Sequence, residues 1–151
     1  MAEKTIGRHI VEVNNLMHRE IIKSDAKEHI TSGRNESISH AASCIIAYLY
    51  NNKDTDIYQK DIEHEFSVRR STVSKVLSLM EEKGHIKRVE VKTDKRLKKI
   101  VLTQKAEAIA EKLTQLRSNV DKKMVEGLSQ TELEILVNIL EKIKKNLSQE
   151  D

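Results

Sequence analysis

The chain has 151 residues, with one cysteine, no proline, 34% charged residues and 3% aromatic residues. This length can bury a real core without a metal or a disulfide, and a single cysteine excludes an intrachain disulfide, which favours a reducing, cytoplasmic setting. No apolar run approaches the roughly 18 residues of a membrane-spanning helix, and few aromatic residues beside so many charges favour amphipathic helices over a β-sandwich or β-barrel.

Apolar residues at helical spacing begin near the N-terminus and predict a long helix over residues 5–31. Its apolar face is made of Ile6, Ile10, Val13, Leu16, Met17 and Ile21. Gly33 and Asn35 both tolerate left-handed backbone, so a turn is predicted at 32–37. A second amphipathic helix follows at about 39–50.

A helix-turn-helix is predicted at about 58–83, as a short helix, a turn and a longer helix that Gly84 ends with a left-handed C-cap. Apolar and polar residues then alternate over 86–91 and 98–102, as they do in half-buried strands. The two strands form a hairpin, the wing, at about 86–102.

Two further helices are predicted over residues 104–148. Thr103 is a good N-cap for the first of them, and Ser129 with Glu132 forms a capping box for the second. Both helices have an apolar stripe at steps of three and four residues.

These elements predict a mainly α fold with a small β-hairpin wing, in a single domain over 1–151. Its winged helix-turn-helix lobe spans 38–103. The terminal helices at 5–31 and 104–148 have strongly apolar faces and little else in the chain to cover them. A two-fold homodimer formed by these dimerisation helices is the economical explanation. The alternative is that the ends pack on each other within one monomer.

Positive charge is concentrated in the helix and wing. Residues 67–99 hold eleven Lys or Arg against four Asp or Glu, a net of +7, whereas the net charge of the whole chain is +3. A focused basic face is typical of a nucleic-acid binder. The alternative for the helix is an ordinary solvated surface.

The second helix of a helix-turn-helix presents its N-terminal residues to base edges in the major groove, where Arg and hydroxyl side chains can read them. The candidate DNA contacts on this helix are Arg69, Arg70, Ser71, Thr72, Ser74 and Lys75. The candidates in the wing are Lys92, Asp94, Lys95, Arg96 and Lys98, and Lys60 in the preceding helix is a weaker one. We interpret Asp94 as an acid that pairs with the guanidinium of Arg96 and orients it.

The segments STVSKVLSLMEEKGHIKR at 71–88 and TDKRLKKIVLT at 93–103 resemble the MarR family of bacterial winged helix-turn-helix transcription regulators. The second segment contains the family's Asp-x-Arg wing motif as Asp94 and Arg96, followed by Leu-Thr at the start of the next helix. The resemblance implies a homodimer held by its terminal helices that binds a palindromic operator in double-stranded DNA, usually as a repressor. It also implies frequent release by a small ligand or by oxidation.

The chain departs from the family pattern at three positions. Ala106 stands where the family usually has Gly, and Arg69 stands where a Ser often caps the recognition helix. Ser67 or Ser71 could take over that cap. His85 replaces the usual apolar residue after the turn glycine, and we expect it to be exposed.

Other polar residues give weaker signals. Cys44 lacks an evident electropositive neighbour and is interpreted as a small buried hydrophobe. His18, His29 and His40 recur at steps of eleven, but no companion ligand supports a metal or proton sensor, so we interpret them as solvated or interface histidines. We find no catalytic centre, metal site or cofactor motif.

The resemblance also suggests a small-molecule effector pocket where the dimerisation helices meet the lobe, with Met17, Ile21, Tyr48 and Leu113 as candidate linings. A rival interpretation is a winged-helix protein-interaction module whose basic face docks an acidic partner without specific DNA binding. Such a face would more often carry exposed aromatic residues, and none occurs between Phe66 and Thr103. The sequence leaves open the operator, the regulated genes, the effector and the choice between repressor and activator.

Overall fold

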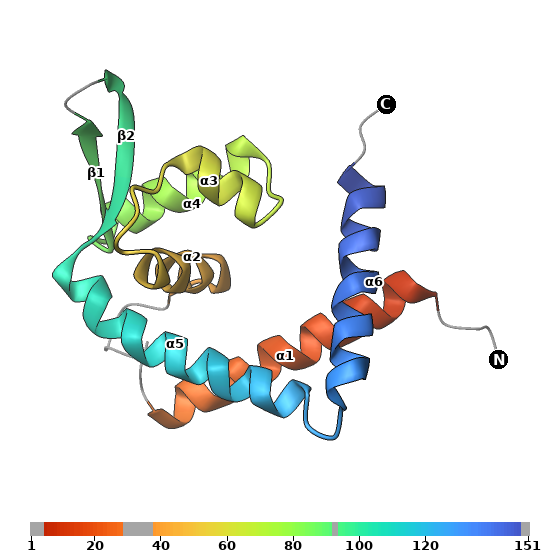
Figure 1. Cartoon of the computed structure of the whole chain (residues 1–151). Helices are drawn as coiled ribbons and strands as arrows, with labels where there is room; N and C mark the ends of the chain where they lie inside the picture. The colour runs from red at the N-terminus through yellow and green to blue at the C-terminus, as the bar shows by residue number, and fades with distance from the viewer. Residues whose placement is uncertain (1–4, 29–37, 92–93, 149–151) are drawn as a thin grey trace.

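The computed structural model describes residues 5–28, 38–91 and 94–148. The chain forms six helices and a two-stranded antiparallel hairpin within these residues, which confirms the predicted mainly α fold with a wing (Figure 1). The elements are α1 (Ile6–Glu28), α2 (His40–Asn51), α3 (Gln59–Glu65), α4 (Arg70–Glu82), β1 (Ile86–Val91), β2 (Asp94–Leu102), α5 (Gln104–Met124) and α6 (Gln130–Ser148). The predicted turn at 32–37, with Gly33 and Asn35, lies outside the described residues, as do 29–31 of the predicted first helix.

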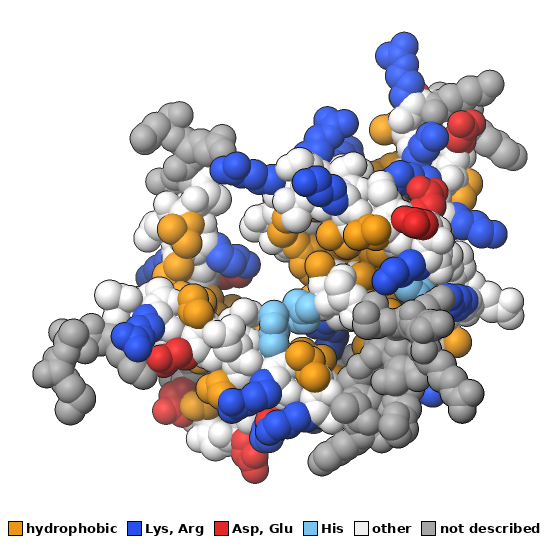
Figure 2. Space-filling view, turned by 180° about the vertical axis from the view of Figure 1, so that it is seen from behind, with side chains coloured by type: hydrophobic (Ala, Val, Ile, Leu, Met, Phe, Trp, Pro, Cys, Tyr) orange, Lys and Arg blue, Asp and Glu red, His pale blue; other side chains and the backbone are white. Residues whose placement is uncertain are grey.

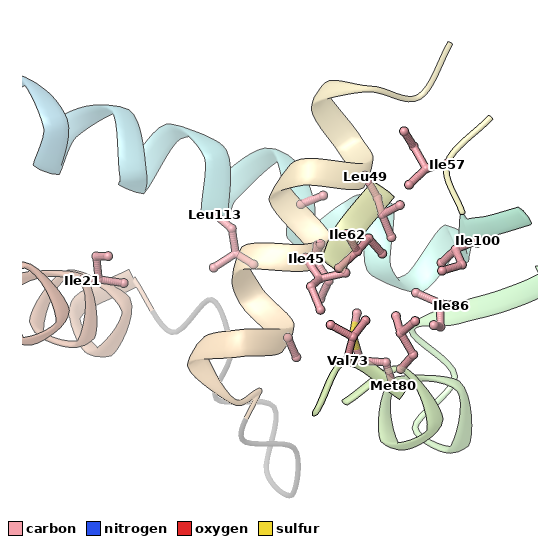
Figure 3. Packing of buried hydrophobic residues seen from close by; sticks show 14 of the residues in the cluster. Ile21, Ile45, Leu49, Ile57, Ile62, Val73, Met80, Ile86, Ile100 and Leu113 are labelled. Atoms are coloured by element: carbon pink, nitrogen blue, oxygen red, sulfur yellow. The ribbon is translucent and has the colours of Figure 1, made fainter. Parts of the chain in front are cut away.

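The lobe consists of α2, α3, α4 and the hairpin, packed around one core (Figure 3). Ile46 of α2, Ile62 of α3 and Leu77 of α4 are completely buried at its centre. Ile86 and Ile100 bring the base of the hairpin into the same cluster. Full burial stabilises a side chain of this size by about 1.5–3 kcal/mol relative to exposure, so this core holds the recognition helix in place.

The turn after α4 fixes the angle between the helix and the wing. Gly84 has a φ of 71°, a left-handed conformation that side chains other than glycine rarely adopt. The chain then folds back, and the N–H of His85 donates to the carbonyl of Met80 at 2.8 Å. His85 is therefore buried, with 1% exposure, and its expected exposure is wrong. The left-handed turn at Gly84 places the next residue against the helix, so its side chain is buried.

The predicted caps are confirmed at two of three helix starts. The Thr103 side chain accepts a hydrogen bond from the N–H of Ala106 at the start of α5, and Ser129 exchanges hydrogen bonds with Glu132 at the start of α6. The N-cap of α4 is Arg69, which makes no side-chain cap bond. Ser67 lies in the α3–α4 turn with a positive φ of 50° and does not take over this cap.

The strand β2 begins at Asp94, four residues earlier than its predicted start at Lys98. The hairpin pairs Glu90 with Lys98, and a register shift follows, after which Val91 pairs with Asp94. The sequence did not predict the first part of β2, because its described side chains are exposed and no alternation of apolar and polar residues marks it.

The arm consists of α1, α5 and α6. Figure 1 shows α5 running beneath the lobe beside α1, with α6 rising at the far end and standing apart from the lobe. α5 buries one side of its length against α2 and α1 through Ala106, Ala110, Leu113, Leu116 and Val120. Lys123 of α5 forms an ion pair with Glu20 of α1, with 2.6 Å between Nζ and Oε2.

The α6 helix buries none of its nineteen residues in the single chain. Its exposed large apolar side chains are Ile135, Leu136, Val137, Ile139, Leu140 and Leu147. On α1, six large apolar residues are likewise exposed, and Ile21 is buried. The ends of one monomer therefore do not cover each other's apolar faces. None of the described helices is long and apolar enough to cross a membrane.

Candidate nucleic-acid interface

The outward face of α4 has the composition that the sequence predicted. Val73, Leu77 and Met80 anchor the helix from behind. The exposed residues at its start are Arg69, Arg70, Ser71, Thr72 and Lys75, and Ser74 is half-buried beside them. The first turn contains no acidic residue and no side-chain cap, so its N–H groups and cations meet solvent without a competing carboxylate.

A concave surface lies between α3 and the wing, with Arg70 of α4 at its edge, and we call it the wing hollow. Its volume is about 330 Å³. The hollow is lined by Tyr58, Gln59, Lys60, Glu63, Arg70, Arg88, Arg96, Leu97, Lys98 and Ile100. Five of these ten residues are cationic and one is acidic. This surface can accept a phosphate group, since cations from four different elements surround one recess.

The predicted DNA contacts therefore divide into two groups. Lys60, Arg70, Arg96 and Lys98 share the wing hollow, whereas the other recognition-helix residues lie on the outward face of α4. Lys92 lies outside the described residues, and the described side chains do not include that of Lys95.

The sequence interpretation missed Arg88, which lines the hollow from β1. The alternating pattern contains a signal for it. Residues two apart share one face of a strand, so Arg88 lies on the same side as buried Ile86 and points toward the helices. Its guanidinium is 3.1 Å from Glu81 at the end of α4, and this ion pair orients it.

The tip and base of the wing are fixed by different contacts. At the tip, a carboxylate oxygen of Asp94 accepts a hydrogen bond from the backbone N–H of Arg96 at 2.9 Å. The interpretation that Asp94 pairs with the Arg96 guanidinium is wrong, because the acid shapes the backbone and leaves the guanidinium to solvent. At the base, Lys99 forms an ion pair with Asp56 at 2.9 Å, and the N–H of Ile100 donates to the carbonyl of Ile57.

The candidate effector residues belong to α1, α2 and α5. Ile21 and Leu113 are buried in the core, and Met17 and Tyr48 pack against it. Tyr48 meets Phe66 edge-on with ring centroids 5.7 Å apart. Desolvation, together with Glu65 and Asp61, raises the pKa of Tyr48. None of these four side chains lines the wing hollow, and the predicted effector pocket stays a prediction.

A polar cluster that the sequence interpretation set aside is assembled from residues of α1, α2 and α5. The rings of His18 and His40 are in contact, with 3.6 Å between centroids, while His29 lies outside the described residues. Cys44 lies beside them, and Arg117 of α5 reaches its sulfur. The expectation that Cys44 lacks an electropositive neighbour is wrong, because the Arg117 guanidinium lies 3.1 Å from its sulfur. The sequence did not reveal this contact because the two residues are 73 positions apart. Among the described residues, no group of three His, Cys, Asp or Glu is arranged to hold a metal ion.

Known proteins share this architecture. Residues 37–97 match the sequence model of the MarR family. The crystal structure of the transcription regulator MarR from Oenococcus oeni PSU-1 is similar with a TM-score of 0.77 and 27% identity, covering 93% of this chain and 99% of that one. The S. aureus MepR–DNA complex is similar with a TM-score of 0.82 and 22% identity, covering 98% of this chain and all of that one (100%).

A third similar structure has a bound ligand. It is the heme sensor protein PefR from Streptococcus agalactiae in complex with heme, with a TM-score of 0.59 and 25% identity, covering 99% of this chain and 97% of that one. The structural similarity thus extends over nearly the whole length of the chain, whereas the family model covers most of the lobe.

Proposed function

The chain is a winged-helix protein of the MarR family, and from this premise we propose that it is a homodimeric repressor that binds a palindromic DNA operator. The observation that carries the proposal is the convergence of the outward α4 face and the wing hollow on one side of the lobe. In the space-filling view, Lys and Arg side chains project from the upper part of the molecule, over the lobe and the wing (Figure 2). The MepR relative, whose structure is a DNA complex, supports the same use of the fold.

The two groups of cations have separate roles in this proposal. The outward face of α4 enters the major groove, where Arg69, Ser71 and Lys75 can donate to base edges. Of the wing-hollow cations, Lys60, Arg70, Arg88 and Lys98 bind phosphates, which set the register of the protein on the duplex. Arg96, with its guanidinium exposed beyond Asp94, extends to the neighbouring minor groove.

A second copy of the chain supplies the other half of the site. The apolar faces of α1 and α6 are exposed in the monomer and provide the surface for a two-fold partner. In such a dimer the two recognition helices enter successive major grooves, about 34 Å apart, so the half-sites are centred about one helical turn apart.

The experiment is selection from a random DNA pool, followed by fluorescence anisotropy at two salt concentrations. A regulator enriches one palindrome and binds it at least a thousandfold, roughly, more tightly than bulk DNA. Affinity should fall with salt by a logarithmic slope of about 0.9 for each neutralised phosphate. Weak, sequence-independent binding that salt abolishes would instead favour the protein-docking alternative.

We further propose that a small effector binds where the arm meets the lobe, near Met17, Ile21, Tyr48 and Leu113. The PefR relative in complex with heme supports effector binding in this fold. In this chain Ile21 and Leu113 belong to the buried core, and Met17 and Tyr48 pack against it. A thermal-shift screen of small aromatic and anionic compounds tests this. The proposal fails if no compound raises the melting temperature, or if Leu113→Phe leaves the response of a hit unchanged.

A further inference from the structure

An exposed leucine lies on the recognition helix. The structure describes all 13 residues of α4, and Leu79 is the only large apolar one among them that is exposed, with an exposed fraction of 56%. Val73, Leu77 and Met80 are buried on another side of the same helix. Leu79 therefore contributes little to the lobe core, and its apolar surface is available to a partner that α4 contacts.

Leu79 belongs to a strip of apolar groups along α4. Thr72, Val76 and Leu79 follow one another at steps of four and three residues, so they lie on one face of the helix. We call them the methyl strip, because each side chain carries at least one methyl group. Val76 is half-buried and packs against the lobe core, which holds the strip in place, while Thr72 and Leu79 are exposed.

A line of polar side chains runs beside the methyl strip. Ser71, Lys75 and Ser78 are exposed, and each immediately precedes one member of the strip, so the two rows run parallel along α4. An α-helix with its side chains is about 10–12 Å across, and the major groove is about 12 Å wide. The groove therefore surrounds the outward half of an inserted helix, and both rows can meet base edges.

The recess next to the methyl strip is too small for an effector. Val76 and Leu79 line it from α4, facing Ile38 and Ser39, and its volume is about 80 Å³. Pockets that bind drug-sized ligands measure about 300–1,000 Å³. A small apolar group such as a methyl can pack against this edge of the helix, whereas a larger ligand cannot be enclosed there.

Thymine is the base whose major-groove edge matches an apolar strip beside a polar line. It presents a C5-methyl group next to the O4 acceptor, and no other DNA base carries a methyl group on that edge. Lys75 can donate to O4 while Leu79 covers the methyl group. The methyl group of a threonine such as Thr72 is also a recurring partner of the thymine methyl.

We propose that the methyl strip contacts thymine methyl groups in each operator half-site and so makes thymine the preferred base at one or more positions. This inference rests on the proposed function and deepens it, because it names the base that the apolar part of the recognition surface selects. Leu79 provides the larger contact, and Thr72 extends it toward the start of α4. Loss of one buried methyl group should weaken binding about fourfold at each half-site.

The test removes methyl groups from the DNA and from the protein in pairs. The probe is the palindrome selected from the random pool, with each thymine replaced in turn, in both half-sites, by deoxyuridine. This replacement keeps every hydrogen-bonding group and removes only the methyl group. For the wild type, fluorescence anisotropy should show about a fifteenfold loss of affinity at one or more positions, fourfold from each half-site.

The protein variants identify the side chain that contacts each methyl group. Leu79→Ala should bind the thymine operator more weakly than the wild type does, and deoxyuridine at the contacted position should cause little further loss. Thr72→Ser removes a methyl group and keeps the hydroxyl, so it should behave in the same way at any position that the Thr72 methyl contacts. Coupling of a thymine position to either variant supports the inference.

Val89→Ala is the matched control, because Val89 is an exposed apolar residue of the lobe on β1, outside the strip. It should lose as much affinity as the wild type on each replacement. The inference is overturned if no replacement weakens wild-type binding, or if each effective replacement weakens Leu79→Ala and Thr72→Ser by the wild-type factor. Either result leaves the proposed function unaffected, since the palindrome is still bound. If the pool yields no palindrome, the proposed function fails and this inference fails with it.

Discussion

The lobe and the arm differ in how far one chain completes them. The lobe closes its own core, with Ile46, Ile62 and Leu77 fully buried by neighbours from the same chain. The arm ends in α6, which has apolar residues along its length and buries none of them. The lobe core is therefore closed within one chain, whereas the arm has an apolar surface that the described residues of one chain leave uncovered. Substitutions in the lobe core should therefore lower the stability of the fold, whereas substitutions on the arm surface should weaken self-association.

The largest effect is expected in the lobe core. Leu77→Ala removes a completely buried side chain from the back of α4 and should lower the free energy of unfolding by about 2–5 kcal/mol. Urea denaturation monitored by circular dichroism measures it. Leu79→Ala is the matched control on the same helix, since Leu79 is 56% exposed, and it should change stability by less than about 0.5 kcal/mol. Equal losses at the two positions would contradict the described orientation of α4.

A substitution on the apolar face of the arm should change self-association. Leu136→Glu places a charge in the uncovered apolar stripe of α6 and should weaken self-association by about 2 kcal/mol or more, while the lobe stays folded. Sedimentation velocity over a concentration series measures this shift. Lys145→Glu, on the opposite side of the same helix, is the control and should leave association nearly unchanged. A wild-type protein that is monomeric at every concentration would contradict the dimer proposal directly.

A substitution in the wing should change DNA binding and leave both the lobe core and the self-association of the arm unaffected. Arg96→Ala should weaken operator affinity by about 1–3 kcal/mol and flatten the salt dependence, because a cation leaves the interface. Fluorescence anisotropy gives the affinity and sedimentation confirms that the dimer is intact. Lys112→Ala removes the same charge from the exposed side of α5 and should leave affinity unchanged. Equal affinity for Arg96→Ala and wild type would mean that the wing does not touch DNA.

The pH dependence of stability should report on the contact between arm and lobe. The folded-state pKa of His40 is about 4, below its ordinary value of 6.5, so the unfolded chain binds more protons between these values. The contribution of His40 is therefore fully present above pH 6.5 and is lost as the pH falls toward 4. We expect the melting temperature of His40→Gln to drop less than that of the wild type between pH 7 and pH 4.5, as differential scanning fluorimetry can measure. Parallel curves would indicate that the ring is solvated in the folded protein.

Local signals explain which features the sequence could predict. Gly84 and Thr103 act on backbone within a few residues, so the turn after α4 and the start of α5 followed from residue type. The placement of Arg70 with Arg96 in one hollow depends on the angle between helix and wing, which no local pattern encodes. The same holds for Arg117 beside Cys44, because that contact requires α5 to pack on α2.

The burial of His85 shows a different limit. A histidine after a helix-ending glycine looks solvated by composition, yet its carbonyl accepts a hydrogen bond from the N–H of Thr103 at 3.0 Å. That bond draws the end of β2 against the start of β1, and the side chain is carried inward with its backbone. The glycine predicted the turn, but the inward direction of the His85 side chain depends on the contact with Thr103, which the local sequence does not encode.

The smallest predicted effect tests the composition of the wing hollow. Glu63 is the one acidic residue among its lining side chains, and it accepts a hydrogen bond from Gln59 at 2.9 Å. A carboxylate among cations repels an incoming phosphate, so Glu63→Gln should raise DNA affinity about two- to fivefold, mainly at low salt where charges are least screened. Anisotropy titrations at two salt concentrations measure the gain in affinity. Glu65→Gln provides the control, because Glu65 belongs to the same helix but does not line the hollow. If both variants gain equally, net charge alone is responsible. If Glu63→Gln loses affinity, the acid instead holds a hollow cation in position, and the phosphate must bind elsewhere on the lobe.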